Sequence, residues 1–151
     1  MVLRTGDFAP CDLNADGTCD AADIDALSLI PKSLYRSAFD LNSDRQLDFQ
    51  DRRLLVNERL NTFFGDANLD GRFGSGDLTL ILASAKYETD QPSTWMEGDF
   101  NGDQRTDSSD LILAYTTNAY ERGPRPLAIP EPAGCVWLLI VVVHQRLRRT
   151  T

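Results

Sequence analysis

The sequence has few of the residues that build nitrogen- and sulfur-based metal sites. Its 151 residues include one His and three Cys, so neither a His-rich zinc centre nor a scaffold of many disulfides is expected. Basic residues are also few, since 15 Lys and Arg face 23 Asp and Glu for a net charge of −8. Without an excess of positive charge, the chain is not expected to bind nucleic acid.

Residues arranged for catalysis are lacking too. The chain has no Gly-x-Ser-x-Gly, P-loop or dinucleotide-binding motif, and its one His, His144, is interpreted as a flank of an apolar segment. A carboxylate pair of the glycosidase type is the remaining catalytic alternative. Trp95 and Trp137 could stack on sugars, but we interpret Trp95 as a core or linker contact and Trp137 as part of the C-terminal tail. We therefore predict that the protein is not an enzyme.

Glu is scarce, and this directs attention to Asp. Of the 23 acidic residues, 18 are Asp and five are Glu. Asp competes for backbone N–H groups, so it favours caps and turns over helix interiors. The hydrophobic fraction of 42% still permits a modest core. We therefore expect the Asp residues in loops between short core-forming elements.

The Asp residues form four clusters of twelve residues that align with one another: loop 1 (12–23), loop 2 (40–51), loop 3 (66–77) and loop 4 (99–110). Every copy has Asp at positions 1, 5 and 12 and Asn at position 3, and three copies have Asp at position 9. The candidate ligands at positions 1, 3, 5, 7, 9 and 12 are Asp12, Asn14, Asp16, Thr18, Asp20 and Asp23; Asp40, Asn42, Asp44, Gln46, Asp48 and Asp51; Asp66, Asn68, Asp70, Arg72 and Asp77; and Asp99, Asn101, Asp103, Arg105, Asp107 and Asp110.

This spacing indicates calcium. Ca²⁺ takes six to eight oxygen ligands, and a tight loop supplies them from alternating positions, with a backbone carbonyl at position 7 and often a water at position 9. The loops hold 15 of the 23 acidic residues but only three of the 15 basic ones, so the rest of the chain has 8 acidic against 12 basic residues. The acidity therefore belongs to the candidate sites. The alternative is a set of Asp-rich surface turns without metal.

The four loops are not expected to bind equally. Position 6 turns sharply and favours Gly, which Gly17 and Gly71 provide, whereas Arg45 and Gln104 bring a side chain to this position. Loop 3 has Gly74 at position 9 and so lacks one carboxylate. Loop 1 alone has no such departure, and we predict that it is the tightest site.

Each loop is followed by apolar residues at helical spacing. These are Ile24, Leu27 and Ile30; Leu54, Leu55 and Leu60; Leu78, Ile81 and Leu82; and Leu111, Ile112 and Tyr115. We predict a helix after each loop with the position-12 Asp in its first turn, and we expect Pro31 to end the first helix. Loops 1 and 4 have no plausible helix before them, while residues 34–39 and 54–64 could enter loops 2 and 3.

The loop sequences resemble type I dockerin repeats. Residues 65–71, GDANLDG, carry the Gly-Asp-x-Asn-x-Asp-Gly pattern, residues 98–103 carry most of it, and position 12 is Asp rather than the Glu of a standard EF-hand. The resemblance implies secreted modules that fold on calcium and dock onto cohesin domains, often beside polysaccharide-degrading enzymes. In that family a Ser/Thr pair at positions 10 and 11 helps to select the partner; Ser108 and Ser109 fit, and the other three loops depart from it.

The C-terminal part is similar to a PEP-CTERM sorting signal. Residues 123–132 form a Pro-rich linker that includes Pro130, Glu131 and Pro132, and an apolar run at 133–143 precedes Arg146, Arg148 and Arg149. As a helix the run spans about 16 Å, against about 30 Å of membrane hydrocarbon. The resemblance implies retention at the inner membrane and removal by an exosortase-type protease. The alternative is a tail that packs on the core as a strand or helix.

Two further features bear on the compartment. Cys11 and Cys19 flank most of loop 1 and either form a disulfide or stay separate thiols with Cys19 packed inward, while Cys135 is a small apolar residue of the tail. Residues 1–7 have no apolar signal-peptide segment. We expect that this chain is the C-terminal part of a longer exported protein, or that the true start of the protein lies elsewhere. A cytosolic protein is the third option.

Together these patterns predict an all-α fold of calcium loop–helix repeats. The expected organisation is a first pair at 7–64, a second pair at 65–122, the linker at 123–132, and an apolar tail helix with its basic end at 133–151. The expected function is a non-catalytic, calcium-binding, dockerin-like module of an exported, surface-sorted protein. An EF-hand-type calcium sensor or buffer is the alternative.

Overall fold

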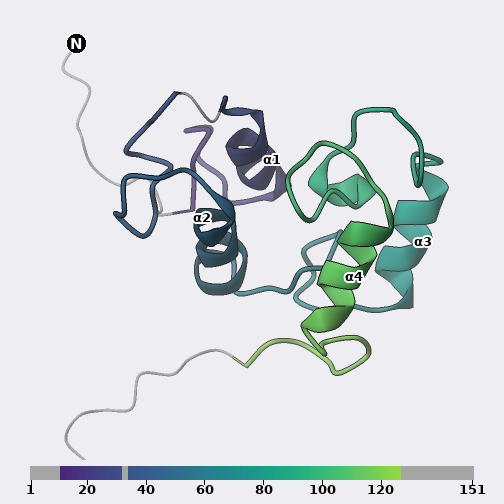
Figure 1. The fold of residues 1–151 in the computed structure, drawn as a ribbon. Helices are drawn as coiled ribbons and strands as arrows, with labels where there is room; N and C mark the ends of the chain where they lie inside the picture. The colour runs from purple at the N-terminus through teal and green to yellow at the C-terminus, as the bar shows by residue number, and fades with distance from the viewer. Residues whose placement is uncertain (1–10, 32–33, 127–151) are drawn as a thin grey trace, which may run out of the picture.

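The regular structure of the chain is helical. The computed structural model describes residues 11–31 and 34–126, and within these ranges it has four short α-helices and no strand. The α-helices are α1 (Ala21–Leu29), α2 (Phe49–Leu54), α3 (Ser75–Ala83) and α4 (Ser108–Thr116). A π-helical turn, η1 (Leu55–Arg59), continues α2, and a 3₁₀ turn, η2 (Trp95–Glu97), precedes loop 4. Figure 1 shows α1 and α2 in one group and α3 and α4 in another. The prediction of a helical fold is confirmed at this level.

Each α-helix begins inside one of the Asp-rich loops. Position 9 is the N-cap residue, with extended backbone, and position 12 is the third residue of the helix. In loops 1, 2 and 4 the position-9 Asp accepts a hydrogen bond from the N–H of position 11, and the position-12 Asp accepts one from the N–H of position 9. This reciprocal pair satisfies two N–H groups that a helix start leaves without partners. A helix therefore follows each loop, as predicted, and α1 ends before Pro31.

The buried face of these helices differs from the predicted apolar stripe. Ile24, Leu55 and Ile81 are buried as expected, but Leu82, Ile112 and Tyr115 are exposed, at 65%, 64% and 44%. The reason is that the position-12 Asp is itself buried in every copy, so the inward face runs through positions 12, 13 and 16. Position 14 on α4 and position 17 on α3 and α4 then point outward.

No α-helix runs directly into loops 2, 3 or 4. Residues 34–39 form bends and turns, and the helical segment within residues 54–64 ends at Arg59. Loop 4 is entered through η2 and Gly98, which has a left-handed backbone. The predicted entering segments of loops 2 and 3 are thus not helices leading into position 1.

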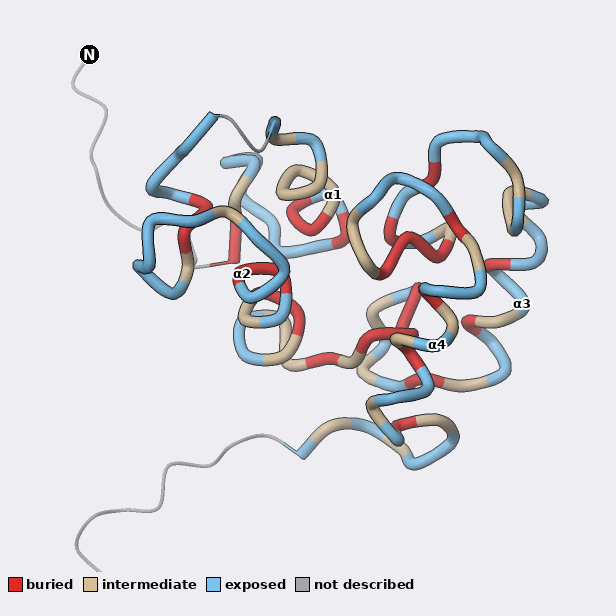
Figure 2. Tube along the Cα trace, in the orientation of Figure 1, coloured by how far each residue is buried: buried red, intermediate tan, exposed pale blue. Residues whose placement is uncertain are grey.

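One hydrophobic core joins the two halves of the described chain. It contains Ile24 and Leu55 from the first half together with Phe73, Ile81 and Phe100 from the second. Trp95 is completely buried at its centre, with ring centroids 5.8 Å from Phe64 and 4.9 Å from Phe100. Figure 2 shows buried segments within both groups of helices and along the chain that connects them. Trp95 is therefore a core residue, as predicted, and offers no surface for a sugar.

The chain after α4 folds back onto loop 3. Phe73 and Tyr120 form an isolated bridge, and the Arg125 N–H donates to the Gly71 carbonyl at 3.3 Å. The Arg125 guanidinium donates to the Thr62 carbonyl and to Asn57, at 2.7 and 2.9 Å. The first residues of the predicted linker are therefore attached to the helical domain.

Several predictions concern residues outside the described ranges. The rest of the linker, the apolar tail helix with Cys135 and Trp137, and the motif residues Pro130, Glu131, Pro132, Arg146, Arg148 and Arg149 all lie there. Within residues 11–31 and 34–126, no helix is both long enough and apolar enough to cross a membrane.

Candidate functional site

All four loops adopt the same backbone arrangement, which the position-12 Asp holds together. Asp23 in loop 1 accepts hydrogen bonds from the N–H groups of Leu13 and Asn14 on one oxygen, and from Asp20 on the other, at 2.7, 3.1 and 2.9 Å. Asp77 and Asp110 repeat all three bonds, and Asp51 repeats those from positions 2 and 9. The last residue of each loop therefore closes it onto its own first turn.

The residues at positions 1, 3 and 5 also bind the loop backbone. Asp12 accepts from the N–H groups of Asp16 and Gly17 at 3.1 and 3.0 Å. The Asn14 side chain accepts from the Asp16 N–H and donates to the Asp16 carboxylate, both at 2.9 Å. The same bonds recur in loops 2, 3 and 4. Asp and Asn are short enough to make these local bonds.

Two positions of each loop have a left-handed backbone. At position 6 the φ angles are +92° for Gly17, +67° for Arg45, +84° for Gly71 and +66° for Gln104. The positive φ that the sequence predicted is therefore present, with a side chain in loops 2 and 4. Position 4 is left-handed as well, at Ala15, Ser43, Leu69 and Gly102, and this was not foreseen. A non-Gly residue in this region costs about 1 kcal/mol, so the loops are built under local strain.

Packing explains why glycines precede loops 3 and 4. Gly65 and Gly98 have φ angles of +107° and +109°. A Cβ on Gly65 would lie 2.6 Å from the Phe73 ring, and one on Gly98 would lie 2.8 Å from Thr106. Phe73 and Thr106 stand at position 8 of their loops and are buried, so Gly is required where the chain enters each loop.

The predicted ligands divide into a buried and an exposed set. The Asp residues at positions 1 and 12 are buried in all four loops: Asp12, Asp23, Asp40, Asp51, Asp66, Asp77, Asp99 and Asp110. Positions 3, 5 and 7 are exposed, except Asn101, which is half-buried. Within the described ranges, none of the eight buried carboxylates forms a salt bridge; the two present join Lys86 to Glu97 and Arg105 to Asp90. Burying charge without a counter-charge is unfavourable, even with good hydrogen bonds.

The pKa shifts follow from this burial. Burial raises the pKa of Asp99 to about 6, although the Arg52 guanidinium nearby opposes the shift. Burial also raises the pKa of Asp66 and Asp110. On the exposed side, the hydrogen bond from the Thr18 hydroxyl lowers the pKa of Asp16. At Asp66, Asp99 and Asp110, which all belong to loops 3 and 4, burial thus disfavours the charged carboxylate.

The donor chemistry of the loops fits a hard cation. Each loop offers carboxylate, amide and backbone oxygens and neither imidazole nor free thiolate, which is the set that calcium prefers. As the side chains stand, no three acidic, His or Cys residues among those described are placed to hold a metal ion. The physical reason is that the carboxylates of positions 1, 5 and 12 face the loop's own N–H groups. Ion binding would require some of these side chains to turn.

Position 9 differs between the loops as the sequence indicated. Asp20, Asp48 and Asp107 each cap the following helix, with bonds to the position-11 N–H of 2.8, 2.7 and 2.7 Å. In loop 3 this residue is Gly74, and α3 has no side-chain cap from its own loop.

Cys11 and Cys19 form a disulfide, with their Cα atoms 5.4 Å apart. Cys11 is buried and Cys19 is exposed. Of the two alternatives left open by the sequence, the bonded one is therefore present, and the inward packing of a free Cys19 is not. The bond ties the residue before loop 1 to position 8 of the same loop.

Arg52 is an important residue that the sequence analysis missed. It is 3% exposed, and its guanidinium donates to the backbone carbonyls of Asp99 and Phe100 at 2.5 and 2.8 Å. It also donates to the Ser28 hydroxyl and the Ile24 carbonyl, at 2.5 and 3.3 Å. Arg52 thus connects loop 4 to α1 from its place on α2. A signal was available, because the other three loops have an aliphatic residue at this position 13.

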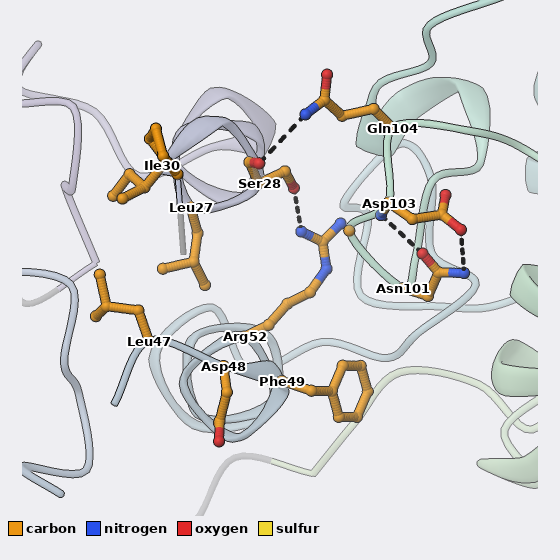
Figure 3. Close-up of a pocket in the computed structure, with 12 residues that line it drawn as sticks. Leu27, Ser28, Ile30, Leu47, Asp48, Phe49, Arg52, Asn101, Asp103 and Gln104 are labelled. Carbon is orange, nitrogen blue, oxygen red and sulfur yellow. Dashed lines mark hydrogen bonds between the residues drawn. The ribbon is translucent and has the colours of Figure 1, made fainter. Parts of the chain in front are cut away.

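A cleft of about 680 Å³ lies beside Arg52, where α1, α2 and loop 4 meet. Its walls combine apolar residues, among them Leu27, Leu47 and Phe49, with polar residues of loop 4 (Figure 3). The Arg52 guanidinium donates four hydrogen bonds to protein oxygens, so its main role is to hold these elements together.

Comparison with protein-family models, with curated proteins and with solved structures finds no match.

Proposed function

We propose that the protein is a non-catalytic, calcium-binding module in which each Asp-rich loop is a calcium site. The observation that carries this proposal is the burial of eight carboxylates at positions 1 and 12 without an ion pair among the described residues. A divalent cation would supply positive charge at all four places, adding at loop 4 to that of the nearby Arg52 guanidinium. Folding and calcium binding would then be coupled, because the unfolded chain has no preformed site.

Calcium is favoured over other ions by donor type and by loop length. The oxygen-only donor set argues against zinc and copper, which prefer nitrogen or sulfur ligands. Magnesium requires near-octahedral geometry and releases its waters reluctantly, whereas calcium accepts six to eight oxygens in a flexible arrangement. Position 12 contributes Asp, which is shorter than the Glu of an EF-hand, so the loop must close more tightly around the ion.

The arrangement supports a dockerin-like module more than an EF-hand-type sensor. A sensor changes the angle between a helix entering the loop and the helix leaving it. In the described chain, loops 2, 3 and 4 have a leaving helix but no α-helix that runs directly into position 1. The repeating unit is thus a loop followed by a helix, which is the unit that the resemblance to dockerins implies.

Exposed apolar residues on α4 support a docking role. Ile112 and Tyr115 line a shallow depression of about 470 Å³ together with Ser108, which stands at position 10 of loop 4. The proposed partner is a cohesin-like domain. Docking onto it would tether polysaccharide-degrading machinery. Measured binding to a panel of purified cohesin domains, with Ile112→Asp as the disrupted variant, tests this part of the proposal.

Export to the cell surface, by way of the inner membrane, is the proposed location. The Cys11–Cys19 disulfide supports an oxidising compartment, because disulfides are rare in the cytosol of mesophiles. Extracellular calcium is also high enough to load sites with dissociation constants of about 10⁻⁴–10⁻³ M. The sorting-signal resemblance of residues 130–149 implies later removal by a membrane protease, which mass spectrometry of the mature protein would test.

Calcium binding is tested by native mass spectrometry and isothermal titration of the full chain. We expect up to four Ca²⁺ per chain. Asp66→Asn should remove one ion or weaken its binding at least tenfold, because position 1 is buried and charged. Glu58→Gln is the control for the loss of one negative charge, since Glu58 lies outside the loops and is exposed. If the wild-type chain bound no Ca²⁺ at millimolar concentration, the proposal would be wrong.

A further inference from the structure

Loop 3 lacks a carboxylate at position 9, but a carboxylate from elsewhere in the chain lies beside that position. The Glu121 Oε1 atom accepts a hydrogen bond from the Ser75 N–H at 3.0 Å, at the start of α3. A Cβ placed on Gly74 would be 3.3 Å from this oxygen, and 3.7 and 3.8 Å from the Glu121 Cδ and Oε2 atoms. The Glu121 carboxylate therefore stands next to where a position-9 side chain would project.

The backbone fixes Glu121 in this place. Its N–H donates to the Phe73 carbonyl at 2.8 Å, and the preceding Tyr120 forms a bridge with Phe73. Glu121 itself has a left-handed backbone, with φ at +56°. These contacts hold the residue to positions 8 and 10 of loop 3 although it is 44 residues beyond position 12.

Loop 4 has the reciprocal arrangement with Glu88. The Glu88 N–H donates to the Thr106 carbonyl at position 8, at 2.8 Å, and its Oε1 accepts from the Ser108 N–H at position 10, at 3.0 Å. Glu88 also has φ at +56°. Glu88 and Glu121 both stand at the 23rd position counted from the first Asp of their repeats. Each repeat of the second pair thus sends a Glu to the helix start of the other.

The two glutamates differ in one respect. Beside Glu88, loop 4 has its own position-9 carboxylate, Asp107, which caps α4 through the Ser109 N–H. Beside Glu121, loop 3 has only Gly74. Glu88 is therefore an additional acid at a complete loop, whereas Glu121 is the one carboxylate found at position 9 of loop 3 in the described chain.

We propose that Glu121 completes the calcium site of loop 3, supplying from the other repeat the position-9 carboxylate that Gly74 cannot provide. Position 9 acts in such loops often through a water, so a carboxylate displaced outward from the loop can still serve. The role rests on the proposed calcium function. It makes site 3 dependent on the folding of the repeat that contains loop 4, so the two sites should load together.

The test compares Glu121→Gln with Glu88→Gln in the full chain. Gln keeps the size and the acceptor oxygen, so each variant retains its bond to the helix start and loses only charge. Calcium is titrated while the amide signals of Gly71 and Gln104 are followed by NMR. These N–H groups donate to the position-1 carboxylates of loops 3 and 4, at 2.8 and 3.0 Å, and so report the two sites separately.

We expect Glu121→Gln to weaken binding at loop 3 about tenfold, because one carboxylate is removed from its ligand set. Glu88→Gln should change binding at loop 4 less than twofold, since Asp107 remains. The double variant Gly74→Asp/Glu121→Gln should restore affinity at loop 3. Gly74 has φ at −148°, close to the −146° of Asp20, so its backbone suits Asp. The flexible end of the residue-121 side chain, 3.3 Å from the added Cβ, has to move by a few tenths of an ångström.

The outcomes separate this role from the proposed function. If the wild-type chain binds calcium and Glu121→Gln behaves like Glu88→Gln, the role of Glu121 is wrong and the calcium function stands. A loss at loop 3 that Gly74→Asp does not restore would likewise contradict a ligand role. If the wild-type chain binds no calcium at loop 3, the proposed function fails at that site, and this role with it.

Discussion

Single residues set the path of the chain into each loop. Gly65 and Gly98 precede position 1 of loops 3 and 4, where the backbone is left-handed and the position-8 side chain lies against the Cα. Loop 1 and loop 2 have Cys11 and Phe39 at the same place, so the first half enters its loops in another way. The Gly-Asp pair of the dockerin-like pattern therefore has a steric cause in the second half.

Gly98→Ala should be strongly destabilising because it combines a left-handed backbone with a collision. The new Cβ would lie 2.8 Å from Thr106 and 3.0 Å from Ile81, both buried. We expect a loss of about 2–4 kcal/mol in the free energy of unfolding. Gly17→Ala is the control, since its φ is also positive but no atom lies within 4 Å of the added Cβ. It should cost about 1 kcal/mol. Urea unfolding in calcium measures both, and equal losses would contradict the packing argument.

At the scale of elements, the loop and its helix form one unit. The position-9 Asp caps the helix, and the position-12 Asp closes the loop on the N–H groups of positions 2, 3 and 9. The helices have only six or nine residues. Isolated helices of this length are not stable in water, so each depends on its loop and on the core.

Two substitutions of Asp48 distinguish the helix-capping role of position 9 from the role of its negative charge. Asp48→Ala removes the acceptor for the Gln50 N–H and should lower the free energy of unfolding by about 1 kcal/mol in saturating calcium. Asp48→Asn keeps a capping oxygen and should leave that stability nearly unchanged, while raising the calcium concentration needed for folding. Thermal melts at several calcium concentrations measure both quantities. If the Asn and Ala variants lost equal stability in saturating calcium, the capping account would be wrong.

The sequence predicted where the helices lie better than it predicted which face of each helix is buried. Asp and Asn at fixed spacing indicated where each loop lay and that a helix followed it, because these short side chains act locally. The exposure of Leu82 and Ile112 was not predicted, because the buried position-12 Asp occupies the inward face that an apolar stripe was expected to fill. The position-4 left-handed residues gave no signal, since Ala15 and Leu69 are not residues that favour that backbone.

At the scale of the whole molecule, a small number of side chains unite the two halves. Arg52 joins the carbonyls of Asp99 and Phe100 to α1, and its guanidinium lies 5.5 Å from the centre of the Trp95 ring. The Trp95 indole N–H donates to the Asp66 carbonyl at 2.8 Å, and its backbone N–H binds Asp25 at the same distance. The first half therefore contacts position 1 of loop 4 through Arg52, and Trp95 extends the connection to loop 3.

Arg52→Met should weaken the contact between the two halves and so lower the stability of the domain. The apolar side chain is of similar length but leaves the carbonyls of Asp99 and Phe100 without their donor in the core. We expect a loss of about 2–4 kcal/mol in the free energy of unfolding in calcium. Arg53→Met is the control, since its neighbour Arg53 is exposed. Urea unfolding followed by Trp fluorescence measures the change. Identical midpoints for the two variants would contradict the bridging role.

These long-range contacts could not be derived from the repeat alone. An alignment of the four loops identifies Arg52 as the exception at position 13, but it gives no partner 47 residues away. The same holds for Glu88 and Glu121, whose matching places in their repeats are visible in the sequence while their exchange between repeats is not. Local chemistry repeats along the chain, whereas the packing of repeats depends on a few unlike residues.

The central claim is that calcium holds this domain together, and the most direct test is far-UV circular dichroism of the full chain in chelator and then in calcium. The buried carboxylates of positions 1 and 12 repel one another without a cation, so the account predicts that the helical signal falls in chelator. It should return on adding Ca²⁺, and Mg²⁺ at equal concentration should restore much less of it. An unchanged helical signal and melting temperature in chelator would contradict the account.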